Sequence, residues 1–317
     1  MKLVLRGLVV VVVAAAVAQS GAAAPARTRL VPRPESAVFW NSRVGLLAIG
    51  YCVPTVNRCS GGAVERTTDG GRTYRVVLRS RRPMTDVATL GTNGAIATPS
   101  SGEAWRTLDG GRTWRQVTFR PFFWATPRIA LRFDAYYQRS TQKLALRVTH
   151  DGGRTFRRLA DPCNNAVTYN AYADLVTPRL WWIICVGLPA GGTMDKAVFL
   201  TRNGGKTWQT AAANLGRPNV RVHGGIGTYG YPNGLAFAAN GFGLVTESNG
   251  TLFVTRDGGL HFHAQRGVDR PNIDYCAGRA AFSSGVGYVL LTAGFSARLV
   301  ETRDSGRTWH VVRRWIS

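Results

Sequence analysis

The chain has 317 residues, of which 45% are hydrophobic and only 18% are charged, so it can bury a sizeable core. Its 37 glycines follow no collagen-like period and form no low-complexity tract, which excludes a fibrous chain and favours many short strands joined by tight turns. Lysine and arginine total 40 against 17 acids, a net charge of +23, so the charge either solubilises the protein or attracts an anionic partner.

The N-terminal segment, residues 1–24, is predicted to be a secretory signal peptide. Lys2 and Arg6 precede a small and apolar run from Gly7 to Ala18. This run is shorter than the roughly 20 residues that span a bilayer, although an uncleaved anchor is the alternative. The pattern predicts export, with the mature protein secreted or held in the cell envelope and carrying no transmembrane segment.

One eight-residue motif recurs six times in the rest of the chain. Each copy begins with Thr, continues through an Asp or Asn to a glycine turn, and ends on an aromatic residue. The third residues are Asp69, Asp109, Asp151, Asn203, Asp257 and Asp304, and the aromatic residues are Tyr74, Trp114, Phe156, Trp208, Phe262 and Trp309. Successive copies lie 40 to 54 residues apart, which is the length of a four-stranded propeller blade with loop insertions.

Simple chemistry explains the motif. A short Asp side chain at a turn accepts hydrogen bonds from backbone N–H groups just downstream. The glycines permit positive φ, and Thr and the aromatic residue fit the strand that follows. These residues are therefore predicted to be structural, since six active sites in one chain are not expected.

Short apolar strands flank every motif copy. In the first repeat they are Ala37–Trp40, Val44–Ile49 and Ala63–Arg66 before the motif, and Arg75–Leu78 after it. The motif should therefore join the third and fourth strands of each blade. We predict an all-β, six-bladed β-propeller over residues 25–317. Its blades span about 35–80, 84–120, 127–160, 166–212, 227–265 and 272–316.

The motif resembles the Asp-box, or bacterial neuraminidase repeat, of the sialidase-like superfamily. The repeat pattern covers the whole mature chain and is closest in style to the non-catalytic propellers that resemble photosystem II stability and assembly factors. The resemblance implies three kinds of protein: such binding rings, exo-sialidases and the larger sortilin-type receptors. It implies no cofactor.

Five cysteines remain in a chain that is predicted to be exported, where disulfides persist. Cys52 and Cys59 flank a short loop and are predicted to form a disulfide. Cys163 and Cys185 are a second candidate pair, which would join the entry loop of one blade to its second strand. Cys276 is then left over. The histidines and cysteines show no metal-binding spacing, so no metal site is predicted.

Sialidase chemistry requires an Asp acid/base, a Tyr nucleophile paired with a Glu, and three arginines that clamp a carboxylate. Asp86, Tyr231 and Glu247 are the weak catalytic candidates. A possible clamp comprises Arg179, Arg221 and Arg279. No Arg-Ile-Pro segment lies near the first blade, where sialidases place their first arginine.

The sequence therefore favours a monomeric, non-catalytic binding or scaffold propeller that recognises a protein or an anionic glycan, such as a cell-wall polymer, at the cell surface. Nucleic acid is not the partner expected in vivo. The alternative is an exo-sialidase-like glycoside hydrolase. One structural feature distinguishes the two functions. The hydrolase requires three arginines that converge beside a Tyr–Glu pair and an Asp, and the binding protein does not.

Overall fold

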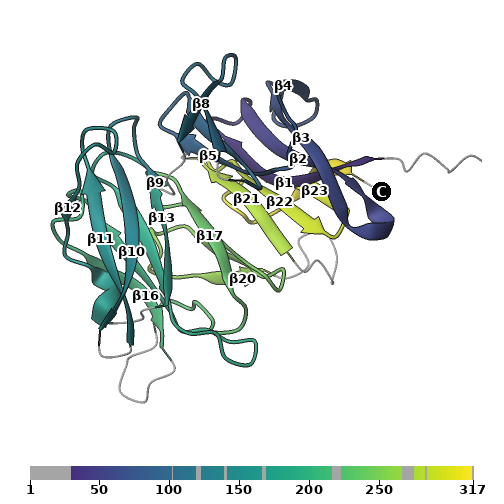
Figure 1. Cartoon of the computed structure of the whole chain (residues 1–317). Helices are drawn as coiled ribbons and strands as arrows, with labels where there is room; N and C mark the ends of the chain where they lie inside the picture. The colour runs from purple at the N-terminus through teal and green to yellow at the C-terminus, as the bar shows by residue number, and fades with distance from the viewer. Residues whose placement is uncertain are drawn as a thin grey trace, which may run out of the picture.

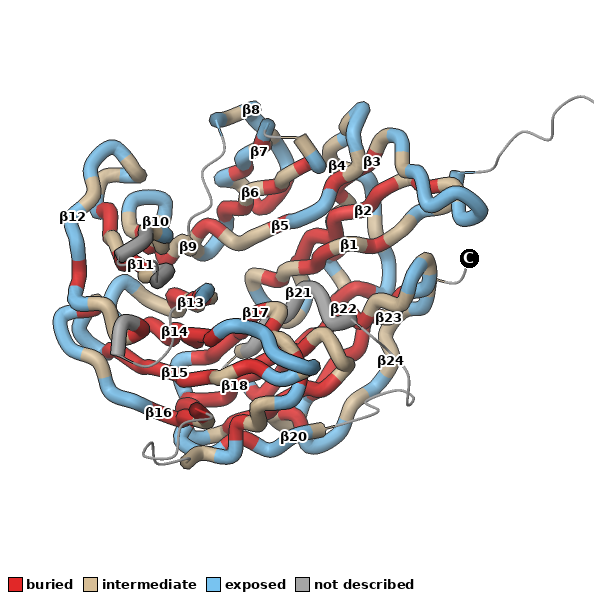
Figure 2. Tube along the Cα trace, turned by 60° about the horizontal axis from the view of Figure 1, so that its bottom comes forward, coloured by how far each residue is buried: buried red, intermediate tan, exposed pale blue. Residues whose placement is uncertain are grey.

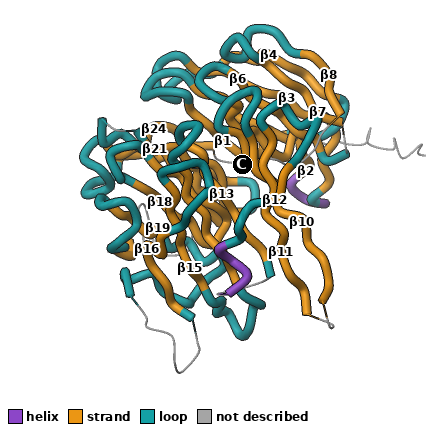
Figure 3. Tube along the Cα trace, turned by 90° about the vertical axis from the view of Figure 1, so that its left-hand side faces the viewer, coloured by secondary structure: helices purple, strands orange, loops and turns teal. Residues whose placement is uncertain are grey.

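The computed structural model describes residues 30–101, 103–118, 123–138, 141–165, 169–215, 223–265, 275–282 and 284–315. Strands dominate this part of the chain, and two short 3-10 helices, η1 (Pro54–Val56) and η2 (Pro162–Asn165), accompany them (Figure 3). None of its helices is long and apolar enough to cross a membrane. The predicted signal peptide lies outside the described residues.

Within the described residues, consecutive strands group into six four-strand units. The first unit contains β1 (Val31–Phe39), β2 (Gly45–Val53), β3 (Arg58–Thr67) and β4 (Arg75–Ser80). The second contains β5 (Met84–Leu90), β6 (Gly94–Pro99), β7 (Glu103–Thr107) and β8 (Arg115–Thr118). The third contains β9 (Phe123–Trp124), β10 (Ala130–Gln138), β11 (Thr141–Thr149) and β12 (Arg157–Arg158).

The other three units repeat this plan. The fourth contains β13 (Asn170–Leu175), β14 (Trp181–Val186), β15 (Lys196–Thr201) and β16 (Gln209–Asn214). The fifth contains β17 (Pro232–Phe237), β18 (Gly243–Glu247), β19 (Leu252–Thr255) and β20 (His263–Gln265). The sixth contains β21 (Tyr275–Ala281), β22 (Gly287–Ala293), β23 (Ser296–Thr302) and β24 (His310–Trp315).

Strands within each unit pair antiparallel in sequence order. The second and third units are joined into one eight-stranded sheet because β9 also meets β5, in a parallel pairing of Leu90 with Trp124. Figure 2 shows the units arranged about a common centre, with the first strands innermost and the fourth strands outermost. The all-β prediction is confirmed at this level, although no single sheet closes on itself.

The repeated motif lies between the third and fourth strands of every unit, as predicted. Each third strand ends at the first Thr of a motif, for example β3 at Thr67 and β15 at Thr201. The middle strands are apolar and packed on both faces, so all residues of β14 and β18 are buried. The outer strand β4 is largely exposed and carries Arg75 and Arg79, charges that disfavour pairing with the edge of another chain.

The first strand begins at Val31, ahead of the predicted start near residue 35. Pro32 and Pro34 read as strand breakers because they lack an N–H group, yet both pair with β2. A proline is tolerated at a sheet edge, where the missing donor would face away from the only neighbouring strand. The innermost strand of the first unit is such an edge.

The first and last units pack against each other (Figure 1). The rings of Phe39 and Tyr288 stack with centroids 4.0 Å apart, and the Tyr288 hydroxyl donates to the Ser42 carbonyl over 2.8 Å. An equivalent stack joins Trp182 to Phe237 between the fourth and fifth units, at 4.4 Å. Aromatic pairs of this kind add stability beyond the area they bury.

Two disulfides link the four expected cysteines. Cys52 on β2 is joined to Cys59 on β3, across the turn that contains η1. Cys163 in η2 is joined to Cys185 on β14, so this bond attaches the segment after the third unit to the second strand of the fourth. The Cys276 side chain lies outside the described residues.

Candidate functional site

Each repeat forms a closed turn held by its own side chains. In the first repeat, the Thr67 hydroxyl donates to Asp69 Oδ1 over 2.8 Å and accepts the Gly71 N–H over 2.9 Å. The Asp69 carboxylate also accepts the N–H and the hydroxyl of Thr73. The second, third and sixth repeats have the same bonds. In the fourth, the Asn203 side-chain amide donates to Thr207 Oγ1 instead.

These bonds fix the charge state of the turn carboxylates. Slight burial acts to raise the pKa of Asp69, but hydrogen bonds from Thr73, Thr67 and the Arg72 N–H lower it to about 2. Hydrogen bonds from Thr113 hold the pKa of Asp109 well below its usual range in the same way. The turn carboxylates are therefore ionised and fully engaged, which supports a structural role for them.

Two of the three catalytic candidates lie close together at the end of the fifth unit that is opposite to its repeated turn. Tyr231 precedes β17 and Glu247 ends β18, and the Ser248 N–H donates to the Tyr231 carbonyl over 2.8 Å. The Tyr231 hydroxyl, however, accepts the Gly192 N–H over 3.1 Å. The Glu247 carboxylate is instead paired with Lys196, which begins β15. The two residues are near in the fold, but their side chains are not hydrogen-bonded to each other as a nucleophile pair.

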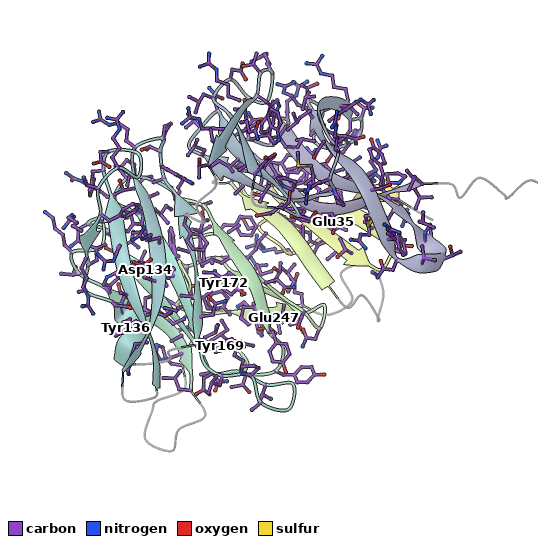
Figure 4. All side chains as sticks on the ribbon, viewed as in Figure 1. Glu35, Asp134, Tyr136, Tyr169, Tyr172 and Glu247 are labelled. Carbon is purple, nitrogen blue, oxygen red and sulfur yellow. A yellow bond between two sulfur atoms is a disulfide. The ribbon has the colours of Figure 1, made fainter. Side chains whose placement is uncertain are left out.

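The Lys196–Glu247 pair is completely buried (Figure 4 labels Glu247). Lys196 Nζ also donates to the Tyr229 carbonyl over 3.1 Å, so one ammonium group connects three segments. Burial raises the pKa of Glu247 to about 7 against the opposing effect of Lys196, and burial lowers the pKa of Lys196. Glu247 Oε2 and Asn249 Nδ2 have no hydrogen-bond partner among the described residues.

The remaining catalytic candidates lie elsewhere. Asp86 is exposed on β5 in the second unit, and no described interaction joins it to Tyr231 or Glu247. The end of each unit that carries the repeated turn is called the motif end. Arg179 lies at the motif end of the fourth unit, because its carbonyl accepts the N–H of Gly204 in the repeat. Arg221 and the side chain of Arg279 lie outside the described residues. The clamp of Arg179, Arg221 and Arg279 therefore stays a prediction.

Cations are conspicuous at the motif end. Five of the six repeats carry one at their sixth position, all of them exposed: Arg72, Arg112, Arg154, Lys206 and Arg307. Arg75, Arg115 and Arg157 follow the aromatic residue in the first three repeats and are exposed as well. Within the described part of the chain, no group of three or more His, Cys, Asp and Glu side chains is placed to hold a metal ion.

Two charged residues of interest escaped prediction. Lys196 reads as the start of an ordinary strand, and its rarity, as one of four lysines, was the only available signal. Arg66 is 7% exposed and donates from Nε to the Gly110 carbonyl in the second unit over 2.6 Å. Their partners are 51 and 44 residues away in sequence, so only the packing of units reveals either contact.

No protein-family model and no curated protein matches the sequence. Solved structures do. A protein of unknown function from Dyadobacter fermentans is 11% identical over 90% of this chain and 94% of its own, with a TM-score of 0.50. An α-L-arabinofuranosidase, Arb93A of Fusarium graminearum, is 13% identical over 84% and 92%, with a TM-score of 0.47. YCF48 from Cyanidioschyzon merolae is 16% identical over 90% and 86%, with a TM-score of 0.44.

At such low identity these likenesses concern the fold alone. They are consistent with the all-β, propeller-like arrangement of the strands.

Proposed function

We propose that the protein is a secreted, non-catalytic β-propeller of six blades that binds an anionic glycan, such as a cell-wall polymer, at the cell surface. Each four-strand unit would be one blade of a closed monomeric ring. The contacts between the first and last units support closure. Export is supported by the N-terminal pattern and by two disulfides, which persist in oxidising compartments.

The observation that carries this proposal is an excess of exposed basic side chains over acidic side chains that could neutralise them. The turn carboxylates are bound by their own repeats, and Glu35, Asp134, Glu247 and Glu301 pair with basic side chains. Exposed arginines at the repeats and on the outer strands outnumber the acids that could neutralise them. A surface of this kind attracts polyanions over long range, in a way that salt screens.

The direct test is binding of the mature, disulfide-bonded protein to polygalacturonate and to poly(glycerol phosphate) at increasing salt. The affinity should fall steeply as salt rises, because binding releases condensed counterions from the polymer. Absence of binding to both polymers at low salt would exclude the proposal.

A sialidase-like hydrolase is the second candidate. It is favoured by one observation, which is that Glu247 has a pKa raised to about 7 and lies next to Tyr231 at the loop end of the fifth unit. A fluorogenic panel led by a sialic acid glycoside tests it. Turnover that disappears in Glu247→Gln and Asp86→Asn, with both variants folded, would establish this function in place of the first.

A further inference from the structure

Two pairs of arginines face each other across neighbouring strands of the first and second units. Arg66 on β3 is the direct partner of Arg75 on β4, and Arg106 on β7 is the direct partner of Arg115 on β8. Like charges directly opposite in a sheet destabilise it. Directly opposed arginines also occur in the third and sixth units, as Arg147 with Arg158 and Arg298 with Arg314.

The Arg66 side chain adds positive charge that has no acidic partner among the described residues. It is buried between the two units, with its stem close to Gly111 of the second repeat, and forms no ion pair with an acidic side chain of the described residues. Among the described residues, its hydrogen-bond partner is the neutral carbonyl of Gly110. Burial lowers the pKa of Arg66. The positive charges of Arg112 and Arg75 lower the same pKa further, and the negative charge of Asp109 opposes them.

Asp109 is poorly placed to neutralise this group. Its carboxylate accepts hydrogen bonds from the Thr107 hydroxyl and from the N–H and hydroxyl of Thr113. A guanidinium that is partly removed from water and has no counter-charge favours the approach of an anion. The seam between the first two units therefore carries positive charge that no described side chain balances.

Two guanidinium groups converge at one backbone position of this seam. Arg112 Nη1 lies 3.8 Å and Arg66 Nη2 lies 4.0 Å from the place that a Cβ atom would occupy on Gly110. Gly110 has a φ of +72°, so a side chain is disfavoured there, and its absence leaves room for both guanidinium groups. Arg112 Nη1 also donates to the Asp109 carbonyl over 3.0 Å, as Arg72 and Arg307 do in their own repeats. Convergent guanidinium groups suit the geometry of phosphate and carboxylate oxygens.

We infer that Arg66, Arg75 and Arg112 form an oxyanion site at the seam between the first two units, which holds one charged group of the anionic polymer. The inference rests on the proposed function and deepens it, because it places the polymer along the motif end of these units. The Arg106–Arg115 pair extends the same cationic surface. A phosphate or a carboxylate would each satisfy these donors.

The third unit provides a matched control for the test. Arg154 and Arg157 occupy the same motif positions as Arg112 and Arg75, but the residue equivalent to Arg66 is Val148. The double variants Arg75→Gln/Arg112→Gln and Arg157→Gln/Arg154→Gln therefore remove the same charge from equivalent exposed positions. Arg66 is left intact because its removal could unfold the seam.

Affinity for polygalacturonate and for poly(glycerol phosphate) is measured for the parent and both variants across a salt series. Loss of charge-assisted bonds should weaken binding of Arg75→Gln/Arg112→Gln by about tenfold or more, with a shallower salt dependence. The affinity of the control variant Arg157→Gln/Arg154→Gln should fall only about twofold. The polymer that shows the larger difference identifies the preferred oxyanion.

A second measurement uses inorganic sulfate as the probe. The increase in thermal midpoint on replacing chloride by sulfate at equal ionic strength should be smaller in Arg75→Gln/Arg112→Gln than in the parent and the control. Equal polymer affinities and equal sulfate effects in the two variants would overturn the site while leaving the binding function standing. A parent that binds neither polymer would overturn the function, and the sulfate comparison would still decide the site.

Discussion

Ser305 occupies a backbone position that favours glycine. It replaces the first glycine of the sixth repeat and has a φ of +57°, whereas the equivalent Gly70 and Gly110 have φ values of +75° and +72°. An L-residue with a side chain is strained in this region. The sixth turn thus keeps the conformation that its hydrogen bonds impose in spite of the residue present.

Ser305→Gly should therefore stabilise the protein. Relief of the left-handed strain is worth about 1 kcal/mol, and the greater freedom of glycine in the unfolded chain removes part of that gain. Urea denaturation should show a higher midpoint with an unchanged slope. Ser296→Gly, the same replacement at the first residue of β23, is the control and should destabilise. A gain in both variants would mean that strain at Ser305 is not the cause.

Glu247 gives a pH dependence whose sign can be worked out. Its pKa is raised from 4.5 to about 7 in the folded protein, chiefly by burial. Between these values the folded state binds more protons than the unfolded state, so this group lowers stability as pH rises through the window. Glu247→Gln should remove that contribution.

The measurement is the free energy of unfolding from pH 4.5 to 7.5. The stability of the parent minus that of Glu247→Gln should decrease as pH rises. Glu103→Gln removes an exposed carboxyl on β7 and is the control for the loss of one acidic group. A difference for Glu247→Gln that does not change with pH would show that its carboxyl does not titrate in this range.

At the scale of the element, the repeated turn depends on acceptors that Asp and Asn share. Asn203 serves in the fourth repeat, with its Oδ1 accepting the Thr207 N–H over 3.0 Å. Asp69→Asn should therefore be tolerated at neutral pH, whereas Asp69→Ala should cost about 1–2 kcal/mol, like the loss of a capping side chain. Thermal denaturation of the two variants gives the comparison.

The pKa of Asp69 adds an acid-range test of the same turn. Because this pKa falls from 3.8 to about 2 on folding, the contribution is complete above pH 3.8 and is lost as pH falls toward 2. Asp69→Asn should be less sensitive to acid than the parent over this range. Equal acid sensitivity would mean that other carboxyls dominate acid unfolding.

What the sequence could predict follows from the range of each interaction. The turns and their flanking strands were predictable, because the side-chain bonds within each repeat join residues four or fewer apart, as between Thr67, Asp69 and Thr73. The parallel contact of β9 with β5 was not, since a single residue pair carries it. Lys196–Glu247 and Arg66–Gly110 depend on how units pack, which no local pattern encodes.

At the scale of the whole molecule, the contact between the first and last units decides how the protein unfolds. In an open array the terminal units would fray, because each would have one neighbour only. In a closed ring every unit has two neighbours. The Phe39–Tyr288 stack and the Tyr288–Ser42 hydrogen bond give the first unit its second neighbour.

The backbone amides of β2 in the first unit should therefore be protected from hydrogen exchange about as well as those of β14 in the fourth unit. Phe39→Ala, which removes the stack between the first and last units, should cost about 3–5 kcal/mol and lower the protection of both strands together. Phe237→Ala, at the seam of the fourth and fifth units, removes an equivalent stack and should give the same uniform loss. Because a closed ring shares the loss among all units, selective fraying of β1 and β2 in Phe39→Ala would identify an open array instead.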